Sequence, residues 1–487
     1  MYGVNKNIVT MTIWIPKLSK DQGPAYLAIA DTLEADIQSG RLAAGARLPT
    51  HRDLADALGV TVGTVTRAYG EAQRRNLISG EVGRGTFVGA QRHTAARLSR
   101  GESGSESAFA RLAPLEPGLI DLSLNRAVAG LSGAQLAEAL RRLSDGEDVG
   151  RLLDYAPDPG SPEHRAAAAH WLASRGLPAT ADQVVLTTGT QNAIATVLAE
   201  LTHPNDTVLT ECLTYPGVKA AARLLHVRLE GIAMDEQGLL PDALERALRT
   251  TGARVLYCIP TLQNPTTAVL SAERRAEVVA LCRRYDAKIV EDNVYGFLVD
   301  RAPEPLMCAA PERTFYLDGT SKLLGGGLRV GLVLTPPGQP VPQSAGRIAA
   351  QVRAASGIVT PLTAELACRW FADGTAARLA VAQRAEAQRR QRLAHRWFDP
   401  LPFQSRPDAP MLWLPIPSPW RADDFVFQAS NRGVAVTPGS VFAVGRDEPA
   451  PAVRVCLGAV SEERLSQGLA ILAELVRQSP EAVPSGQ

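Results

Sequence analysis

The chain has 487 residues and a mass of 51.9 kDa, which is too long for one ordinary hydrophobic core and indicates two or three domains. Hydrophobic residues make up 45% and charged residues 21%, values typical of a soluble globular protein. The formal net charge is +1, so bulk charge indicates neither a nucleic-acid nor a membrane partner, and local charge has to be examined instead.

The six cysteines are scattered along the chain and include no Cys-x-x-Cys pair. Four of them lie in apolar or helical contexts, which is typical of reduced thiols in a cytosolic protein. No apolar run approaches the roughly 18 residues of a membrane-spanning helix, and the N-terminus lacks an export sequence. We therefore expect a cytoplasmic protein with no membrane partner and no metal site.

Three short helices are predicted between Pro24 and residue 72. The second spans 50–58, is capped by Thr50 and ends at Gly59, and Thr61 caps the third. A tight, glycine-containing turn between two helices is typical of a helix-turn-helix. Apolar residues at helical spacing mark the buried sides, namely Tyr26, Ile29, Ala30, Leu33 and Ile37 in the first helix and Val65, Ala68, Tyr69 and Ala72 in the third.

A β-hairpin is predicted after the third helix, from strand-like residues 77–79 and 86–88 with Arg84 at the tip between them. Residues 41–90 hold seven arginines, no lysine and four acidic residues, a local excess of three positive charges. Spacing alone leaves a helical docking module as the alternative to a DNA-binding domain. Contacts with DNA phosphates, and some with base edges, are expected from Arg52, Thr61, Thr64, Arg67 and Arg84.

Two stretches of this block carry a family resemblance: GRLAAGARLPTHRDLADALGVTVGTVTRAY at 40–69 and GRGTFV at 83–88. They resemble the winged helix of the GntR family of bacterial repressors. The resemblance implies that residues 20–90 form a winged helix-turn-helix, mostly α-helical with a β-hairpin wing, that binds a double-stranded DNA operator. Val62 is a departure, because many members have an arginine at this place in the recognition helix.

Residues 91–117 contain GESGSES, scattered arginines and two prolines, a composition that predicts a flexible linker. A larger unit is expected at 118–480, with a large part at about 150–335 and a small part at about 340–480. Strands and amphipathic helices alternate in it, which predicts a mostly parallel sheet covered on both faces, with a ligand site at the strands' C-terminal ends. The expected strands are Val184–Thr187, Thr207–Thr210, Arg254–Ile259, Lys288–Glu291, Phe315–Leu317 and Val330–Leu334.

Polar residues or glycines follow most of these strands. Gly189, Thr190 and Gln191 come directly before a predicted helix, whose N-terminus would present free N–H groups to an anion. Each group also has an ordinary structural explanation, such as a turn at Asn264 or a helix cap at Asp292. Six groups in one order at the same edge of a sheet are hard to assign to chance. The remaining members are Tyr215, Asn264, Asp292, Tyr295, Ser321, Lys322 and Arg329.

Lys322 is the centre of this set, because it lies just past an expected buried strand. A charged amine is costly to bury, so the lysine is expected either to be paired or to have a lowered pKa. A lysine with a lowered pKa is a nucleophile that can form a Schiff base. The alternative is a phosphate-binding or surface lysine.

This order of residues resembles the fold type I, aspartate-aminotransferase-like enzymes that use pyridoxal 5'-phosphate (PLP), over about residues 118–475. The resemblance implies an α/β PLP-dependent transferase fold with a smaller C-terminal α/β subdomain. It implies that Lys322 holds PLP as an aldimine and that Asp292 pairs with the pyridine nitrogen. Tyr215 would stack on the ring, and Asn264 and Tyr295 would bind its phenolic oxygen.

The same resemblance implies that Tyr155 reaches the PLP phosphate of a neighbouring subunit, and therefore a homodimer. Arg454 would bind the carboxylate of a substrate or effector. Gly319 departs from the pattern, because many relatives carry a phosphate-binding serine there, and the nearby Thr320 is the hydroxyl that would replace it. The phosphate ligands implied within the chain are Gly189, Thr190, Gln191, Ser321 and Arg329.

A GntR-type winged helix, a linker and an aminotransferase-like unit, in this order, resemble the MocR subfamily of transcriptional regulators. The resemblance implies a PLP-dependent regulator that senses an amine or amino acid effector through the Lys322 aldimine. Two alternatives use the same residues. One is an active aminotransferase with a DNA-binding appendage, and the other is a regulator that responds to the level of PLP itself.

Overall fold

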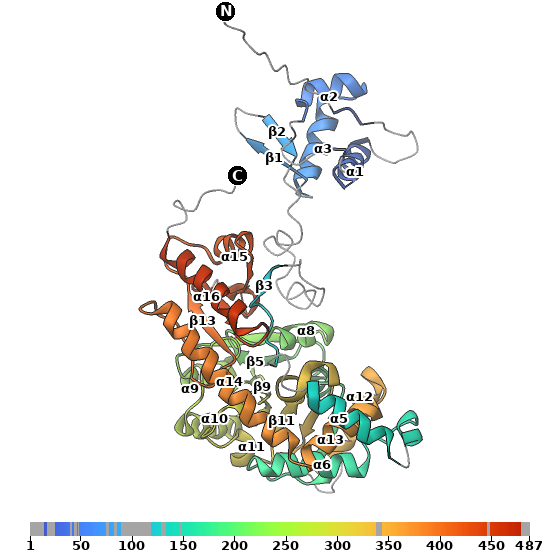
Figure 1. The fold of residues 1–487 in the computed structure, drawn as a ribbon, viewed down its shortest axis with the longest axis vertical. Helices are drawn as coiled ribbons and strands as arrows, with labels where there is room; N and C mark the ends of the chain where they lie inside the picture. Colours follow the sequence, from blue (N-terminus) through green and yellow to red (C-terminus); the bar gives the residue numbers. More distant parts are fainter. Residues whose placement is uncertain are drawn as a thin grey trace, which may run out of the picture. The chain divides into compact units, whose positions relative to one another are not determined.

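A computed structural model of the chain describes residues 14–16, 25–38, 41–42, 46, 48–74, 77–81, 85–88, 118–127, 133–146, 149–337, 343–445 and 449–478. These residues fall in two compact units, Met1–Arg100 and Gly101–Gln487 (Figure 1). The expected linker at 91–117 and Arg84 lie outside the described residues. Among the helices that the structure describes, none is both long and apolar enough to cross a membrane.

The first unit contains helices α1 (Ala25–Gln38), α2 (His51–Leu58) and α3 (Val62–Arg74) and the antiparallel hairpin of β1 (Ile78–Glu81) and β2 (Gly85–Val88). The predicted caps are present. Thr50 Oγ1 accepts a hydrogen bond from Asp53 N at 3.3 Å, and Thr61 Oγ1 accepts one from Thr64 N at 3.2 Å. Gly59 ends α2 with a φ of 65°, a conformation that glycine adopts without strain.

The core of this unit contains most of the apolar residues that the helical spacing predicted, although Tyr26 is only half-buried, and it also contains Trp14, Leu42 and Leu48. Ile29, Leu33 and Leu54 are fully buried, and Tyr69 OH donates to Pro49 O at 2.9 Å from inside the core. Val65, Ala68 and Ala72 line the buried side of α3, as predicted. The wing packs on the same cluster through Ile78 and Val88. Packing of α3 against α1 and α2 therefore fixes which side of α3 remains exposed.

The second unit is built on a seven-stranded sheet in the order β4-β12-β11-β10-β9-β5-β6. β12 is antiparallel to both of its neighbours, and the other strands pair in parallel. All six predicted strands are present, with bounds that differ by at most two residues. β6 was not predicted, because an edge strand with half-exposed polar residues lacks a clear apolar pattern. The strands are β4 (Val184–Thr187), β5 (Thr207–Glu211), β6 (Arg228–Ile232), β9 (Val255–Cys258), β10 (Lys288–Asp292), β11 (Thr314–Gly319) and β12 (Gly331–Leu334).

Helices cover both faces of this sheet, as the strand and helix alternation predicted (Figure 1). One face packs against α7 (Thr190–Leu201), α8 (Pro216–Leu224) and α12 (Gln343–Ser356). The helices on the other face are α6 (Pro162–Ser174), α9 (Pro241–Thr251), α10 (Ala272–Arg284), α11 (Leu306–Ala309) and α13 (Pro361–Ala372). β7 (Met234–Asp235) and β8 (Gly238–Leu239) form a separate small hairpin, and α5 (Gly133–Ser144) precedes the sheet in sequence.

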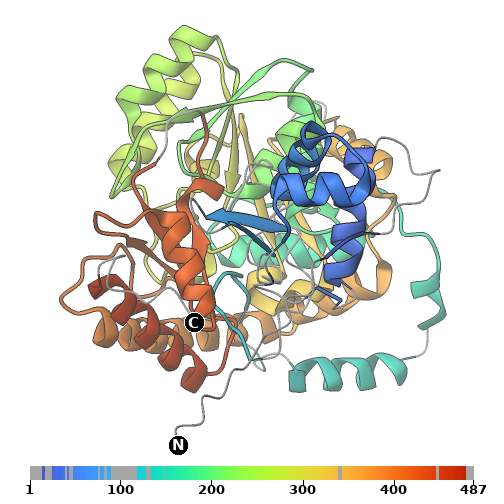
Figure 2. The ribbon, with the colours of Figure 1, turned by 90° about the horizontal axis from the view of Figure 1, so that it is seen from above.

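A smaller subdomain follows the sheet in sequence. It contains the strands β13 (Met411–Pro415), β15 (Thr437–Pro438) and β16 (Ala452–Cys456) and the helices α15 (Ala422–Asn431) and α16 (Glu462–Arg477). The long helix α14 (Thr375–Phe398) lies beside α16, in orange and red in Figure 2. β3 (Ile120–Asp121) pairs in parallel with β14 (Val434–Ala435), so the start of the second unit packs with its end. The expected small part at 340–480 omitted this contribution from residues 118–122.

Candidate functional sites

Lys322 lies in a π-helical turn, Ser321–Gly325, immediately after β11. Its Nζ donates to the backbone oxygen of Asn125 at 2.6 Å and lies 6.0 Å from the centre of the Tyr295 ring. Burial of the amine lowers the pKa of Lys322 to about 8. The Lys322 side chain as a whole is half-buried, and the lowered pKa of its amine agrees with the expectation from its place after a buried strand.

Asp292 is the last residue of β10, and its side chain is buried at the sheet's C-terminal edge. Tyr257 OH donates to Asp292 Oδ2 at 2.7 Å from the neighbouring strand β9. Burial raises the pKa of Asp292 to about 6, although the tyrosine hydrogen bond opposes this shift. Tyr257 was not predicted as a site residue, because an aromatic side chain inside an apolar strand is usually part of the core.

Arg454 projects from β16 and is only 8% exposed. Its Nη1 donates to Asn264 Oδ1 at 2.9 Å, and its Nη2 donates to Ser123 O at 2.6 Å. The guanidinium carbon lies 4.7 Å from the centre of the Phe442 ring. The structure thus brings the expected carboxylate-binding arginine next to Asn264, in the segment that follows β9. The two residues are 190 positions apart in the sequence.

Gly189 is the N-cap of α7 and has a φ of 80°. A side chain at this position would meet the guanidinium of Arg329, since a Cβ built on Gly189 would lie 2.8 Å from Arg329 Nη2. Arg329 Nη2 also donates to Thr188 O at 3.3 Å, and Gln191 Nε2 donates to Gly217 O at 2.8 Å. The Arg329 guanidinium therefore lies against the α7 N-terminus, and both groups favour an anion.

The absence of a side chain at Gly319 has a steric reason. A Cβ there would lie 2.5 Å from Thr190 Oγ1, so the Thr190 hydroxyl fills the space next to Gly319. The interpretation that Thr320 replaces the missing serine is not supported. Thr320 is buried, and its Oγ1 donates to Val330 O at 3.0 Å. This hydrogen bond stabilises the turn that contains Lys322. Thr190 is the hydroxyl that stands near this position instead.

Two tyrosines complete the group around Lys322. Tyr215 is the N-cap of α8, and a side chain on Gly217 would collide with its ring. Burial, followed by the charge of Asp292, raises the pKa of Tyr215 to about 12, which keeps its hydroxyl protonated. Tyr295 is buried, and its OH accepts a hydrogen bond from Asn125 Nδ2 at 3.2 Å. Asn125 was not predicted, although it contacts both Lys322 and Tyr295.

Tyr155 does not lie with the residues around Lys322 in its own chain. Its side chain is 92% exposed, after the 3-10 helix Val149–Leu153, so it does not pack against the site of its own chain. Ser321, by contrast, is beside Lys322 in the same turn and is half-buried.

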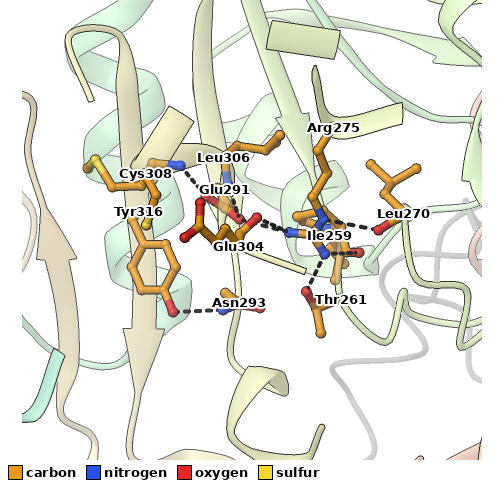
Figure 3. Close-up of polar contacts among 12 residues, drawn as sticks. Ile259, Thr261, Leu270, Arg275, Glu291, Asn293, Glu304, Leu306, Cys308 and Tyr316 are labelled. Carbon is orange, nitrogen blue, oxygen red and sulfur yellow. Dashed lines mark hydrogen bonds and ion pairs between the residues drawn. The ribbon is translucent and has the colours of Figure 1, made fainter. Parts of the chain in front are cut away.

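A buried ion pair holds the two chain segments that carry Asn264 and Asp292 (Figure 3). Arg275 of α10 donates to Pro260 O at 2.9 Å and to Thr261 Oγ1 at 2.8 Å, three residues before Asn264. It also lies 3.8 Å from Glu291, which directly precedes Asp292. Glu291 in turn accepts hydrogen bonds from the N–H groups of Leu306 and Met307 at the start of α11, at 3.0 and 2.9 Å. The network fixes both segments to the helical layer behind the sheet.

The first unit exposes part of the expected DNA-binding set. Arg52 on α2, Thr61 just before α3 and Arg67 on α3 are exposed. Thr64 is half-buried, and its hydroxyl lies 2.9 Å from that of Thr61. The guanidinium of Arg67 lies over the ring of Tyr26, 4.4 Å from its centre, a contact that was not predicted. This cation–π contact limits the orientations of the arginine while leaving it accessible.

The fold and these sites define a winged-helix protein with a fold type I aminotransferase-like unit. A family model described as "Bacterial regulatory proteins, gntR family" matches residues 25–88, and one described as "Aminotransferase class I and II" matches residues 117–472. The chain belongs to the aminotransferase class I and II family. It is also a member of the HTH-type transcriptional regulators that join this domain to a GntR winged helix, the MocR-type architecture.

Relatives of both kinds are similar to this chain. The HTH-type transcriptional regulator YdeF of Bacillus subtilis is 30% identical over 95% of this chain and 96% of its own length. YdcR of Escherichia coli, also described as an HTH-type transcriptional regulator, is 25% identical over 87% and 92%. The crystal structure of the α-aminoadipate aminotransferase LysN from Thermus thermophilus, in complex with N-(5'-phosphopyridoxyl)-L-leucine, superposes with a TM-score of 0.69. It is 23% identical and covers 79% of this chain and 96% of its own.

Proposed function

We propose that this regulator binds PLP and that its aminotransferase-like unit senses a primary amine or amino acid at Lys322. The observation that carries the proposal is the half-buried Lys322, whose amine donates to Asn125 O at 2.6 Å and has a pKa lowered to about 8, in a chain that also has a winged helix. A regulator has to act on DNA, so we place the protein in the cytoplasm.

The residues fit PLP. Among the described residues, three buried polar atoms of this site have no hydrogen-bond partner: Asn125 Oδ1, Gln191 Oε1 and Arg454 Nε. An unpartnered buried polar atom costs about 1–3 kcal/mol, which a polar ligand relieves. Burial raises the pKa of Asp292, and a pyridinium nitrogen would supply a positive charge that favours the ionised carboxylate. The α7 N-terminus and the adjacent Arg329 suit the phosphate.

This chain supplies residues for the ring nitrogen, the ring face, the phenolic oxygen and the phosphate of PLP. Asp292, oriented by Tyr257, would hold the ring nitrogen, and Tyr215 would lie on the ring face. Asn264 and Tyr295 would hold the phenolic oxygen. Gly189, Thr190, Gln191, Ser321 and Arg329 would hold the phosphate. When bound, PLP supplies an aldehyde carbon with which a primary amine condenses.

Arg454 points to the chemical class of the effector. A guanidinium binds a carboxylate with two parallel hydrogen bonds, and Arg454 has an unused N–H at Nε. An amino acid would therefore place its carboxylate at Arg454 and its amine in place of Lys322. Lys322 would be released as the effector amine takes its place, an exchange of one amine for another that needs no oxidant or reductant.

We further propose that the protein is a homodimer through its aminotransferase-like units. Tyr155 and Leu153 are each 92% exposed, and Leu136, Leu140 and Leu362 are exposed by 37%, 44% and 40%. A partner subunit that covered these apolar side chains would remove them from water. A partner would also bring Tyr155 to a phosphate site. Light scattering is expected to give twice the chain mass of 51.9 kDa. A monomeric mass at full PLP occupancy would contradict the dimer.

An amine panel separates a sensor from an enzyme. The purified protein is loaded with PLP and mixed with amino acids, while cofactor absorbance, keto-acid product and operator affinity are followed. A sensor is expected to change absorbance and DNA affinity without steady release of a keto acid. Steady turnover would instead support the active aminotransferase, and a response to PLP alone would support a sensor of PLP level.

Arg67→Ala is expected to weaken operator binding and to reduce the slope of log affinity against log salt concentration by about 1, because each lost phosphate contact removes about one released counterion. Arg84→Ala is expected to do the same at the wing. Binding isotherms at several salt concentrations measure the slope. Arg396→Ala is the control, an exposed arginine of the second unit that should leave the slope unchanged. Wild-type slopes in both variants would refute this placement of the DNA surface.

PLP uptake by the cofactor-free protein is expected to depend on pH through Lys322. The neutral amine is the nucleophile, so protonation below its pKa of about 8 slows uptake. From one unit below to one unit above this pKa, the rate should rise about tenfold and then level off. An ordinary lysine would give a rise of roughly a hundredfold with no levelling. Lys322→Ala is the control, because Lys219 also has a pKa lowered to about 8.

A further inference from the structure

Residues 118–126, which follow the linker in sequence and are called here the entry segment, touch both groups that the proposed function assigns to the effector. The backbone oxygen of Ser123 accepts a hydrogen bond from Arg454 Nη2 at 2.6 Å. The backbone oxygen of Asn125 accepts one from Lys322 Nζ, also at 2.6 Å. Two carbonyls only two residues apart therefore contact the expected carboxylate-binding group and the expected amine-binding group.

The rest of the entry segment is attached to the small subdomain. Ile120 and Leu122 are buried in the same cluster as the apolar residues of β13, β16 and α16. Thr437 Oγ1 also donates to Ser123 O at 3.1 Å, and Cys456 Sγ donates to it at 3.7 Å, so this carbonyl accepts from three donors. Further bonds run from Ile120 N to Gly433 O, from Leu122 N to Ala435 O, from Cys456 N to Leu122 O and from Arg464 Nη2 to Gly118 O. The segment is thus anchored to the small subdomain and makes one contact to Lys322 and one to Arg454, which together are called here the amine site.

We propose that the entry segment passes the state of the amine site to residues 91–117 and so to the DNA-binding unit, an inference that rests on the proposed function. A free Lys322 amine has hydrogens to donate to Asn125 O, and it loses at least one of them when it is bonded to a carbon of the cofactor. An effector carboxylate at Arg454 competes with Ser123 O for the guanidinium.

Effector binding therefore changes the two contacts in opposite directions. It frees the lysine, which strengthens the contact at Asn125, and it occupies Arg454, which weakens the contact at Ser123. Both changes act on one short piece of backbone, and they give the two states of the protein the differential contact that coupling requires. An amine without a carboxylate makes only the first change and should give a smaller response.

Gly458 allows the entry segment to be displaced without changing Lys322 or Arg454. A Cβ at Gly458 would collide with the backbone oxygen of Arg126, and the φ of Gly458 is outside the left-handed region, so alanine moves the segment and does not strain its own backbone. Gly346→Ala in α12 is the matched control, because nothing lies within 4 Å of an added Cβ there. Thr437→Val is a second variant, which removes a donor to Ser123 O at nearly constant volume.

The experiment measures, for each full-length PLP-loaded variant, the absorbance response to the most effective amino acid of the panel and the ratio of operator affinities with and without it. Gly458→Ala and Thr437→Val are expected to keep the absorbance response while the affinity ratio falls toward one, and Gly346→Ala should keep both. Wild-type ratios in both Gly458→Ala and Thr437→Val would overturn the inference and leave the proposed function intact. If the DNA affinity of the wild-type protein does not change with any amine, both the inference and the proposed function are refuted.

Discussion

Lys322→Ala is expected to abolish the effect of an amine effector on operator affinity while leaving DNA binding itself in place. Alanine has no amine to bond the cofactor or to donate to Asn125 O, so the two states of the site no longer differ at this contact. Coupling between two sites is typically about 1–3 kcal/mol, or roughly 5- to 150-fold in affinity, and this ratio should fall to one. Operator titrations with and without the amine measure it.

The winged helix provides the control for this variant. Its core and its caps lie within the first unit, so Lys322→Ala should bind the operator in the absence of effector as the wild type does. The visible absorbance of bound PLP should disappear at the same time. If the variant loses its absorbance but still responds fully to the amine, exchange at Lys322 is not the signal and a separate effector site must exist.

Arg454→Ala is expected to make the protein insensitive to the carboxylate of its effector. Removing one partner of a buried charged hydrogen bond costs about 2 kcal/mol or more, which corresponds to a loss of roughly 30-fold in affinity. Lys322 and Asp292 make no hydrogen bond to Arg454 among those the structure shows, so the variant should still take up PLP. Absorbance titrations with an amino acid and with the amine that lacks its carboxylate give the two affinities.

The decarboxylated amine is the control ligand for Arg454→Ala. The variant should lose affinity for the amino acid and bind the decarboxylated amine about as the wild type does, because only the first ligand uses the guanidinium. An equal loss for both ligands would mean that Arg454 supports the site only through Asn264 and Ser123. An unchanged affinity for the amino acid would show that the carboxylate binds elsewhere.

Much of the fold follows from the sequence, because local rules and tertiary packing agree. Thr50, Gly59 and Thr61 occur where the ends of helices need them, and the apolar runs of β4, β9 and β10 are buried on both faces of the sheet. The order of polar residues after these strands indicated a site at one edge of the sheet. Lys322, Asp292 and Gln191 belong to segments that were predicted from this order.

Other parts of the site have no signal in a single sequence. Ser123 and Asn125 act through backbone oxygens, which every residue possesses, so their identity does not reveal their role. Tyr257 is an aromatic residue in an apolar strand until the register of β9 and β10 places it on the same face as Asp292. The contact of Arg67 with Tyr26 depends on how α3 packs on α1. Long-range packing determines these positions.

The central claim is that one binding event at Lys322 both changes the cofactor's environment and changes DNA affinity. It is tested most directly by titrating the PLP-loaded wild-type protein with the most effective amine while cofactor absorbance and operator affinity are followed in the same samples. Linkage requires the two curves to share one midpoint, once the operator concentration is taken into account. The account predicts coincident curves. An absorbance change that reaches saturation while operator affinity stays constant would contradict it.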